Sequence, residues 1–145
     1  MSARIDPGLA AWVAPFARDL VSQTDFHVWV GLELLSLEAG RAEVGFTAQG
    51  GMMLRGGYVH GGVLNGLMEP PGLLALLGHM HEDETAVTVD IHLQHLRSVL
   101  AGERVILTGQ LLRRGRNVAF CEVNARVGGT LCTTARITKA IQKAS

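Results

Sequence analysis

Hydrophobic residues follow two different spacings along the chain. Near the N-terminus they recur at helical intervals, at Leu9, Trp12, Val13, Phe16 and Leu20. The dipeptide Asp6-Pro7 before them has the chemistry of an N-cap and a first helical turn. We therefore predict an amphipathic helix over about residues 7–22.

Alternation of polar and apolar residues, which is typical of half-buried strands, marks most of the remaining chain. It predicts strands at residues 30–37 and 41–48, joined by a turn at Glu38-Ala39-Gly40. After residue 86 no helix signal follows, and four more strands are predicted, at 86–96, 104–113, 117–127 and 130–141. The pair Gly128-Gly129 is typical of a two-residue hairpin turn.

A second and far more apolar helix is predicted between the two groups of strands, from about Gly61 to Met80. Because it lacks a polar face it has to be buried, so we expect it to pack on one face of an antiparallel sheet. Pro70 and Pro71 predict a kink right after Glu69. The fold class is α+β, and with no internal repeat or linker we expect a single domain over residues 1–145.

Composition argues against several classes of partner. The 13 basic and 13 acidic side chains cancel, so the charge expected of a nucleic-acid or membrane-surface binder is missing. No segment is long and uncharged enough to span a bilayer, and the N-terminal segment lacks the pattern of a secretion signal.

In the predicted register Cys121 and Cys132 lie roughly 13 Å apart, too far for a disulfide. Free buried thiols fit a reducing compartment, and the cytoplasm is the expected location.

A motif stands at the start of the central helix. His60-Gly61-Gly62 opens it, and Glu69 follows nine residues after the histidine. The segments TVDIHLQHLRSV and RRGRNVAFCEV come later. Together these residues resemble the hotdog-fold acyl-CoA thioesterases of the PaaI / 4-hydroxybenzoyl-CoA thioesterase type, from about Val30 to Ile141. The resemblance implies an antiparallel sheet wrapped around a long central helix, in a homodimer or homotetramer that hydrolyses acyl-CoA without a metal or prosthetic group.

The resemblance also implies roles for individual residues. The backbone N–H of Gly61 would polarise the thioester carbonyl, and Glu69 would act as nucleophile or general base. The hydroxyl of Thr88 on the following strand would assist. His60 would contact the substrate or, as is more common in this motif, tie the loop to the helix start by a hydrogen bond. Gly62 would let a ligand approach the backbone, although tight packing of the helix start against the sheet also explains this glycine pair.

The spacing of Gly61 and Glu69 makes a structural demand. A helix N-terminus offers unpaired N–H groups and a positive dipole end, which suit an oxyanion at a thioester carbonyl. Glu69 lies eight residues further on, or roughly 12 Å along a regular helix, so one carbonyl group cannot contact both residues. If both act on the same thioester, they come from two subunits whose helices run antiparallel across a two-fold axis. The expected assembly is therefore at least a dimer.

The setting of Glu69 favours a function. It stands in an apolar run, where a carboxylate is costly to keep, whereas a solvated and inert acid is the alternative. Two positions depart from the family: Leu54 stands where many members have Asn or Gln, and Leu73 where some have a hydroxyl. Either Asn65, one turn before Glu69, substitutes for the missing polar group, or hydrolysis is slow or absent. As an ordinary polar helix residue, Asn65 would have no such role.

Cations for the phosphates of CoA are the remaining candidates. Four arginines qualify, although a charge run at a hairpin tip is usually a solvated turn: Arg55, Arg113, Arg114 and Arg116. The histidines at 79, 81, 92 and 95 lack the Cys or Asp that would complete a metal site, so no metal is predicted.

The predicted function is hydrolysis of an aliphatic or aryl acyl-CoA to free acid and CoA. The alternative is a hotdog module that binds acyl-CoA or a free acyl ligand without turning it over.

Overall fold

The computed structural model describes residues 2–145. Its α-helices are α1 (Val13–Gln23), α2 (Asp25–Val30), α3 (Gly61–Leu67) and α4 (Glu69–Leu77), and a 3-10 helix spans Gly50–Met52. Its strands are β1 (Arg4–Ile5), β2 (Glu33–Glu38), β3 (Arg41–Thr47), β4 (Glu84–His95), β5 (Arg104–Arg114), β6 (Val118–Val127) and β7 (Thr130–Lys143). The order of helices and strands confirms the predicted α+β class.

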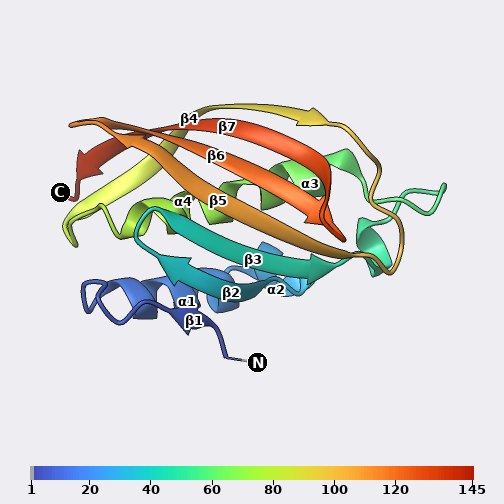
Figure 1. Ribbon diagram of the computed structural model, residues 1–145, viewed down its shortest axis with the longest axis horizontal. Coiled ribbons are helices and arrows are strands. Elements are labelled where there is room, and N and C mark those ends of the chain that lie inside the picture. The colour runs from blue at the N-terminus through green and yellow to red at the C-terminus, as the bar shows by residue number, and fades with distance from the viewer. Residues whose placement is uncertain (1) are drawn as a thin grey trace.

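The strands form one curved sheet that arches over α3 and α4, while α1 and α2 lie on the side of β1 and β2 (Figure 1). The strand order is β1-β2-β3-β5-β6-β7-β4. Neighbouring strands are antiparallel, except that the short β1 pairs parallel with β2. The sheet is therefore mixed rather than wholly antiparallel as predicted. The strand β1 was not predicted, because sequence periodicity does not detect a strand of two residues.

The N-terminal helix begins at Val13 rather than near residue 7. Asp6 does use its carboxylate to accept a backbone N–H, from Gly8 at 2.8 Å, but this closes a local turn and no helix follows at once. A second short helix, α2, comes directly after α1 and ends at Gly31, which has a positive φ of 68°. Sequence patterning had missed it because only six residues are helical.

The central helix is broken one residue earlier than predicted. The turn at Met68 separates α3 from α4, and Glu69 is the first residue of α4, with Pro70 and Pro71 directly behind it. In a first turn the missing proline N–H groups leave no hydrogen bond unmade, so the two prolines are accommodated directly after the break. The break puts the Glu69 carboxylate at a helix N-terminus, where the helix dipole stabilises negative charge.

Burial is concentrated between α4 and the concave face of the sheet. Leu74, Leu76 and Leu77 are almost fully buried. Gly109 on β5 allows this close approach, since a Cβ there would lie 2.0 Å from the carbonyl oxygen of Pro71. The central helix is thus clamped against the sheet by contacts that any side chain at position 109 would prevent.

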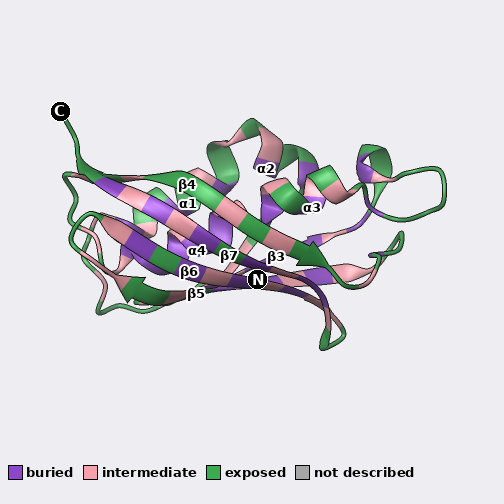
Figure 2. Ribbon diagram, turned by 90° about the horizontal axis from the view of Figure 1, so that it is seen from above, coloured by how far each residue is buried: buried purple, intermediate pink, exposed green. Residues whose placement is uncertain are grey.

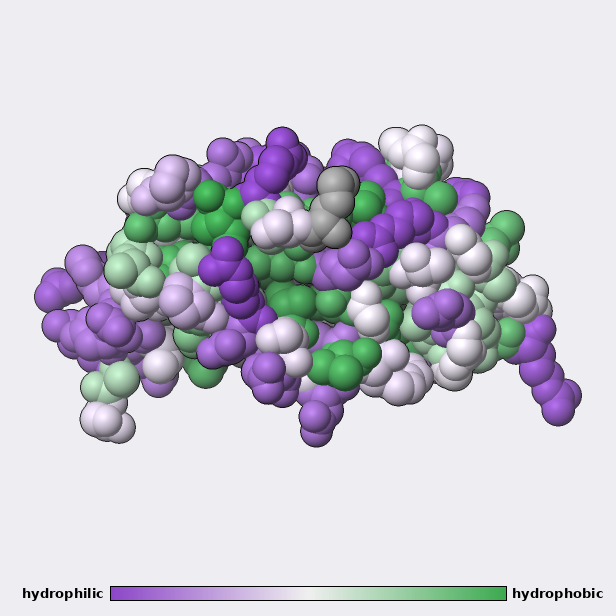
Figure 3. Space-filling view, turned by 90° about the horizontal axis from the view of Figure 1, so that it is seen from below, coloured by the Kyte–Doolittle hydropathy of each residue, from purple (hydrophilic) through white to green (hydrophobic). Residues whose placement is uncertain are grey.

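The two edges of the sheet differ. On the β4 edge most residues are exposed or half-buried, whereas along the neighbouring β7 buried residues alternate with more exposed ones (Figure 2). The opposite edge is β1. The face seen from below intersperses hydrophobic and hydrophilic residues without one dominant hydrophobic area (Figure 3).

Candidate active site

The start of α3 exposes a single backbone donor. The ring Nδ1 of His60 accepts the N–H of Gly62 at 2.8 Å, so His60 caps the helix as the more common form of the motif predicts. The amides of Val63 and Leu64 donate to the carbonyl oxygen of His60. Among residues 2–145 the N–H of Gly61 has no acceptor. The amide of Gly62 is therefore engaged within the helix start, and that of Gly61 remains available to a ligand.

A histidine that sequence reasoning considered only as a metal ligand lies beside Gly61. A Cβ on Gly61 would lie 3.6 Å from Nε2 of His95. This nitrogen donates to the side-chain oxygen of Asn65 at 2.8 Å, and Nδ1 lies 3.0 Å from the hydroxyl of Thr133. Asn65 is thus engaged at the Gly61 end of the helix, and no hydrogen bond joins it to Glu69. A shallow cavity of about 310 Å³ lies here, lined in part by Leu54.

Glu69 lies in a second cluster at the start of α4. Its Oε2 accepts a hydrogen bond from the hydroxyl of Thr88 at 2.7 Å. The same oxygen accepts from Nζ of Lys139 at 3.1 Å, and Lys139 also donates to the hydroxyl of Thr88 at 2.9 Å. The predicted pair of Glu69 and Thr88 is therefore brought together, and a cation that sequence reasoning missed joins it.

Strand pairing explains how this cluster forms. Thr88 on β4 is the direct register partner of Lys139 on β7, so both side chains point to the same face of the sheet, toward α4. Only 4% of the Lys139 side chain is exposed, against 34% of Glu69. The one signal in the sequence is that Lys139 continues the inward-facing alternation of Ala135 and Ile137. That alternation marks a buried lysine but not its partner.

An apolar groove lies close to Glu69, although Glu69 does not line it. Its volume is about 480 Å³, and three polar residues, Glu82, Glu84 and Thr85, stand in its lining beside Trp12, Phe16, Leu73, Leu77, Met80 and Ala86. Leu73 and Leu77 follow Glu69 by one and two helical turns. Ala86 precedes Thr88 by two residues on the same strand, so one end of the groove lies about one helical turn from Glu69 and the other reaches α1.

The four arginine candidates are not equivalent. Arg114 donates to both carboxylate oxygens of Glu84 at 2.8 Å and also to the carbonyl oxygen of His79. The backbone N–H of His81, and after it this contact with Arg114, hold the pKa of Glu84 below its usual range. Arg114 thus ties the β5–β6 hairpin to β4. Arg55, Arg113 and Arg116 are exposed.

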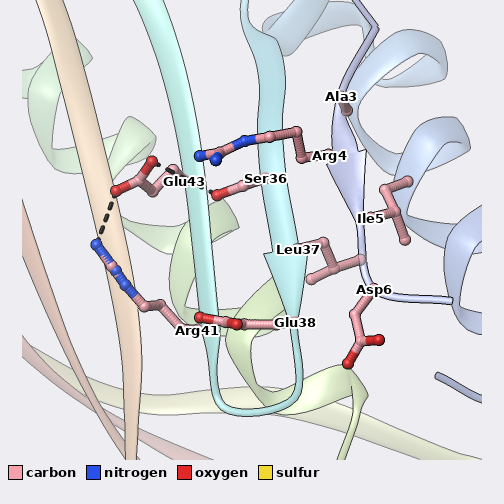
Figure 4. A pocket seen from close by; sticks show the side chains of 9 residues that line it. All are labelled: Ala3, Arg4, Ile5, Asp6, Ser36, Leu37, Glu38, Arg41 and Glu43. Atoms are coloured by element: carbon pink, nitrogen blue, oxygen red, sulfur yellow. Dashed lines mark hydrogen bonds and ion pairs between the residues drawn. The ribbon is translucent and has the colours of Figure 1, made fainter. Parts of the chain in front are cut away.

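A larger cavity lies elsewhere. It measures about 650 Å³ and is lined by residues of β1, β2 and β3, at the sheet edge opposite β4 (Figure 4). Its walls carry Arg4, Asp6, Glu38, Arg41 and Glu43. Sequence reasoning singled out none of these residues for chemistry.

Neither cysteine forms a disulfide. Cys121 and Cys132 are both buried and free, as predicted, and a bulge in the β6–β7 pairing puts Thr133 rather than Cys132 opposite Ala125. Burial raises the pKa of the Cys121 thiol to about 11.

In the part of the chain that the structure describes, no group of three His, Cys, Asp or Glu side chains gathers as a metal site would require. No helix in this part has the length and apolarity to cross a membrane.

Known proteins resemble this chain in sequence and in structure. A Haemophilus influenzae protein named "Putative esterase" is 34% identical over 86 residues, which cover 59% of this chain and 62% of that relative, less than two thirds of its length. The crystal structure of a Haemophilus influenzae thioesterase is 26% identical, matches 87% of this chain and 88% of its own, and superposes with a TM-score of 0.79.

The fold is shared more widely. The E. coli PaaI protein from the phenylacetic acid degradation operon covers 95% of this chain and 99% of its own at 18% identity, with a TM-score of 0.85. At that identity the likeness shows a common hotdog fold. The family model described as the thioesterase superfamily matches residues 56–134, more than half of the chain, from the loop before His60 through β4, β5 and β6 into the start of β7. The chain therefore belongs to the thioesterase superfamily.

Proposed function

We propose that the protein hydrolyses an acyl-CoA thioester to the free acid and CoA, with Glu69 as nucleophile or general base. The observation that carries this proposal is a partly exposed carboxylate held by Thr88 and Lys139, with an apolar groove that begins about one helical turn away at Leu73. Membership in the thioesterase superfamily supports the same reaction class. The proposed fourth participant is the N–H of Gly61, which would stabilise the oxyanion of the thioester carbonyl.

The complete site would require two subunits. Gly61 and Glu69 lie in separate clusters with no shared hydrogen bond, and the break at Met68 does not bring them together. The edge of β4 supports an interface, because this strand pairs only with β7 and its Val87 and Val89 are exposed. Pairing of two β4 edges about a two-fold axis would set Glu69 of one protomer against Gly61 of its partner, in a homodimer or a homotetramer built from such dimers.

The groove beside Glu69 would hold the acyl group. Its lining is largely aliphatic and aromatic, with Glu82, Glu84 and Thr85 as the polar members, and it fits an aliphatic or aryl acid rather than a strongly polar one. Leu73, which replaces a hydroxyl found in some relatives, contributes apolar surface at this position. For the phosphates of CoA the exposed Arg55, Arg113 and Arg116 are the proposed cations, while Arg114 is held by Glu84.

The test is a release assay for free thiol with the full chain and a panel of short, medium, long and aryl acyl-CoAs. Turnover with at least one aliphatic or aryl acyl group, and higher kcat/KM than for a polar acyl group of similar size, is the expected result. A panel on which no member is hydrolysed above the background rate would refute the proposal.

One observation favours binding without turnover. Leu54 is 42% exposed at the cavity beside Gly61 and supplies no hydrogen bond to a polar transition state. If hydrolysis occurs and Leu54 limits it, Leu54→Asn should raise kcat and leave KM near the parent value. Tight acyl-CoA binding by calorimetry together with no thiol release from either protein would instead identify a binding module.

A further inference from the structure

We propose that Lys139 is a positioning residue that holds Glu69 through Oε2 and thereby makes Oε1 the reactive oxygen. This inference rests on the proposed function and adds to it a buried cation from the last strand. Neither the motif of the central helix nor the pairing of Glu69 with Thr88 predicts this cation.

The direction of each hydrogen bond follows from the chemistry of the three groups. A lysine ammonium has three donors and no acceptor, so the 2.9 Å contact requires the hydroxyl of Thr88 to accept from Lys139. The single hydroxyl hydrogen of Thr88 then points to Oε2 of Glu69, 2.7 Å away. Lys139 itself donates to the same oxygen at 3.1 Å. Within residues 2–145 no side chain or amide makes a hydrogen bond or an ion pair to Oε1.

Burial explains why this arrangement is rigid. An ammonium that is 4% exposed pays a large desolvation cost unless it is paired and hydrogen-bonded. The groups that face it are Glu69 from α4 and Thr88 from β4, and Cys121 on β6 is the nearest thiol. Its other register neighbour, Ala119 on β6, is apolar. The lysine therefore cannot relax into water, and its two contacts hold the carboxylate in one rotamer.

The geometry assigns a separate task to each oxygen in the proposed reaction. In the nucleophilic course a lone pair of Oε1 forms a bond to the thioester carbon, and the C–S bond breaks to release the CoA thiolate. Oε2 becomes the carbonyl oxygen of the resulting mixed anhydride and stays bonded to Lys139 and Thr88. Water then attacks the anhydride, its oxygen leaves with the acyl group as the free acid, and the carboxylate of Glu69 is restored while the released proton neutralises the thiolate. In the general-base course Oε1 takes a proton from water as the water oxygen bonds to the thioester carbon, the C–S bond breaks, and this proton passes to the departing thiolate. Both courses need Oε1 free and Oε2 fixed.

The experiment compares two lysines of the same strand. Lys139→Met removes the charge and keeps a similar apolar stem, while Lys143→Met is the control, because Lys143 is 79% exposed and pairs with Asp83 only at 3.7 Å. With an acyl-CoA that the parent hydrolyses, Lys139→Met should lower kcat by about tenfold or more while KM stays within about twofold. Lys143→Met should keep both constants within about twofold of the parent.

Rescue by a small amine separates positioning from structural damage. Lys139→Ala leaves space at the former ammonium, so added methylammonium should raise its kcat severalfold. It should not do so for Lys139→Met, whose side chain fills the space, nor for Glu69→Gln. Because the Ala variant is assayed on its own, the test also stands if the Met variant fails to fold. In the Glu69→Gln background, Lys139→Met should cause no further loss of kcat, since the lysine acts through the carboxylate.

The outcomes separate this inference from the function on which it rests. An active parent with Lys139→Met within about threefold of its kcat, or a folded Lys139→Ala that is inactive and indifferent to methylammonium, overturns the role of Lys139 alone. A parent that hydrolyses no acyl-CoA of the panel overturns the proposed function and this role together. A selective loss of kcat with amine rescue supports both.

Discussion

The molecule contains two clusters made of the same three kinds of group. At one sheet edge Glu69 meets the hydroxyl of Thr88 and the ammonium of Lys139. Near the other edge Glu43 meets the guanidinium of Arg41 at 2.8 Å and, more weakly, the hydroxyl of Ser36 at 3.5 Å (Figure 4). Each is a carboxylate with a hydroxyl and a cation, so residue type alone does not distinguish them.

Burial and geometry do distinguish the two clusters. Glu43 uses both carboxylate oxygens, Oε1 for Arg41 and Oε2 for Ser36, and the Arg41 side chain is 43% exposed. Lys139 is 4% exposed, and both bonds to Glu69 converge on Oε2. The Glu43 cluster nevertheless lines the larger cavity, about 650 Å³. Cavity size therefore does not decide between the two clusters, and the desolvated cation beside the carboxylate is what favours the Glu69 cluster as the proposed site.

The largest expected difference between the clusters is in turnover after loss of the carboxylate charge. Glu69→Gln keeps nearly the same volume and apolar contacts, but removes the negative charge that we propose attacks the thioester or takes a proton. It should lower kcat by about a hundredfold or more, or roughly 2.7 kcal/mol of transition-state stabilisation. Glu43→Gln is the matched control and should leave kcat within about twofold. Acyl-CoA binding by both variants should match the parent. Glu69→Gln activity within about threefold of the parent would remove Glu69 from the mechanism.

The second prediction tests whether only the Glu69 cluster needs a partner subunit. Gly61→Ala should be tolerated in the fold, since its methyl would lie 3.6 Å from His95, but it should block the approach of the thioester carbonyl to the amide. Mixing unfolded Gly61→Ala and Glu69→Gln and refolding them together should restore about a quarter of parent activity, because half of the dimers are mixed and each has one intact site. Each variant refolded alone should stay inactive. No recovery in the mixture, with light scattering confirming dimers, would contradict a shared site.

Removal of the hydroxyl group should lower kcat by about ten times more in the Glu69 cluster than in the Glu43 cluster. Thr88→Val is nearly isosteric and removes the 2.7 Å bond to Oε2, so kcat should fall by about tenfold while Lys139 still holds the carboxylate. Ser36→Ala removes only a 3.5 Å contact at the surface and should leave kcat unchanged. Steady-state kinetics on both variants with one acyl-CoA decide the point, and equal effects would erase the distinction between the clusters.

The smallest predicted effect concerns the stability of the exposed pair. Arg41→Gln should lower the free energy of unfolding by at most about 1 kcal/mol, because an ion pair open to solvent is screened and its side chains lose entropy. Urea unfolding at low and high salt measures this effect, which should shrink further at high salt. A loss of several kcal/mol would show that the Arg41 pair is as strongly coupled to the fold as the buried lysine is expected to be.

Much of the fold could be predicted because it follows from local patterns. The alternation of 104–113 and 117–127 and the apolar run after Gly61 specify strands and a buried helix without reference to the rest of the chain. The predictions that were wrong also concern local structure. The Asp6 side chain accepts a hydrogen bond within a turn and does not cap a helix, and Pro70 and Pro71 stand in the first turn of α4 rather than inside one continuous helix. In both places a sequence signal fits two backbone conformations, and packing selects one.

The candidate site also has one part that could be predicted from local patterns and one that could not. The helical segment that contains Gly61 and Glu69, and the strand that contains Thr88, follow from the sequence, because motif spacing and periodicity are properties of short segments. That Lys139, 70 residues from Glu69, reaches the same carboxylate oxygen as Thr88 follows from the tertiary structure alone. The pairing of β4 with β7 and the packing of α4 on their concave face bring the three groups together. Long-range register of this kind leaves no trace in local periodicity, since alternation records which side of a strand faces inward and not which residue it meets there.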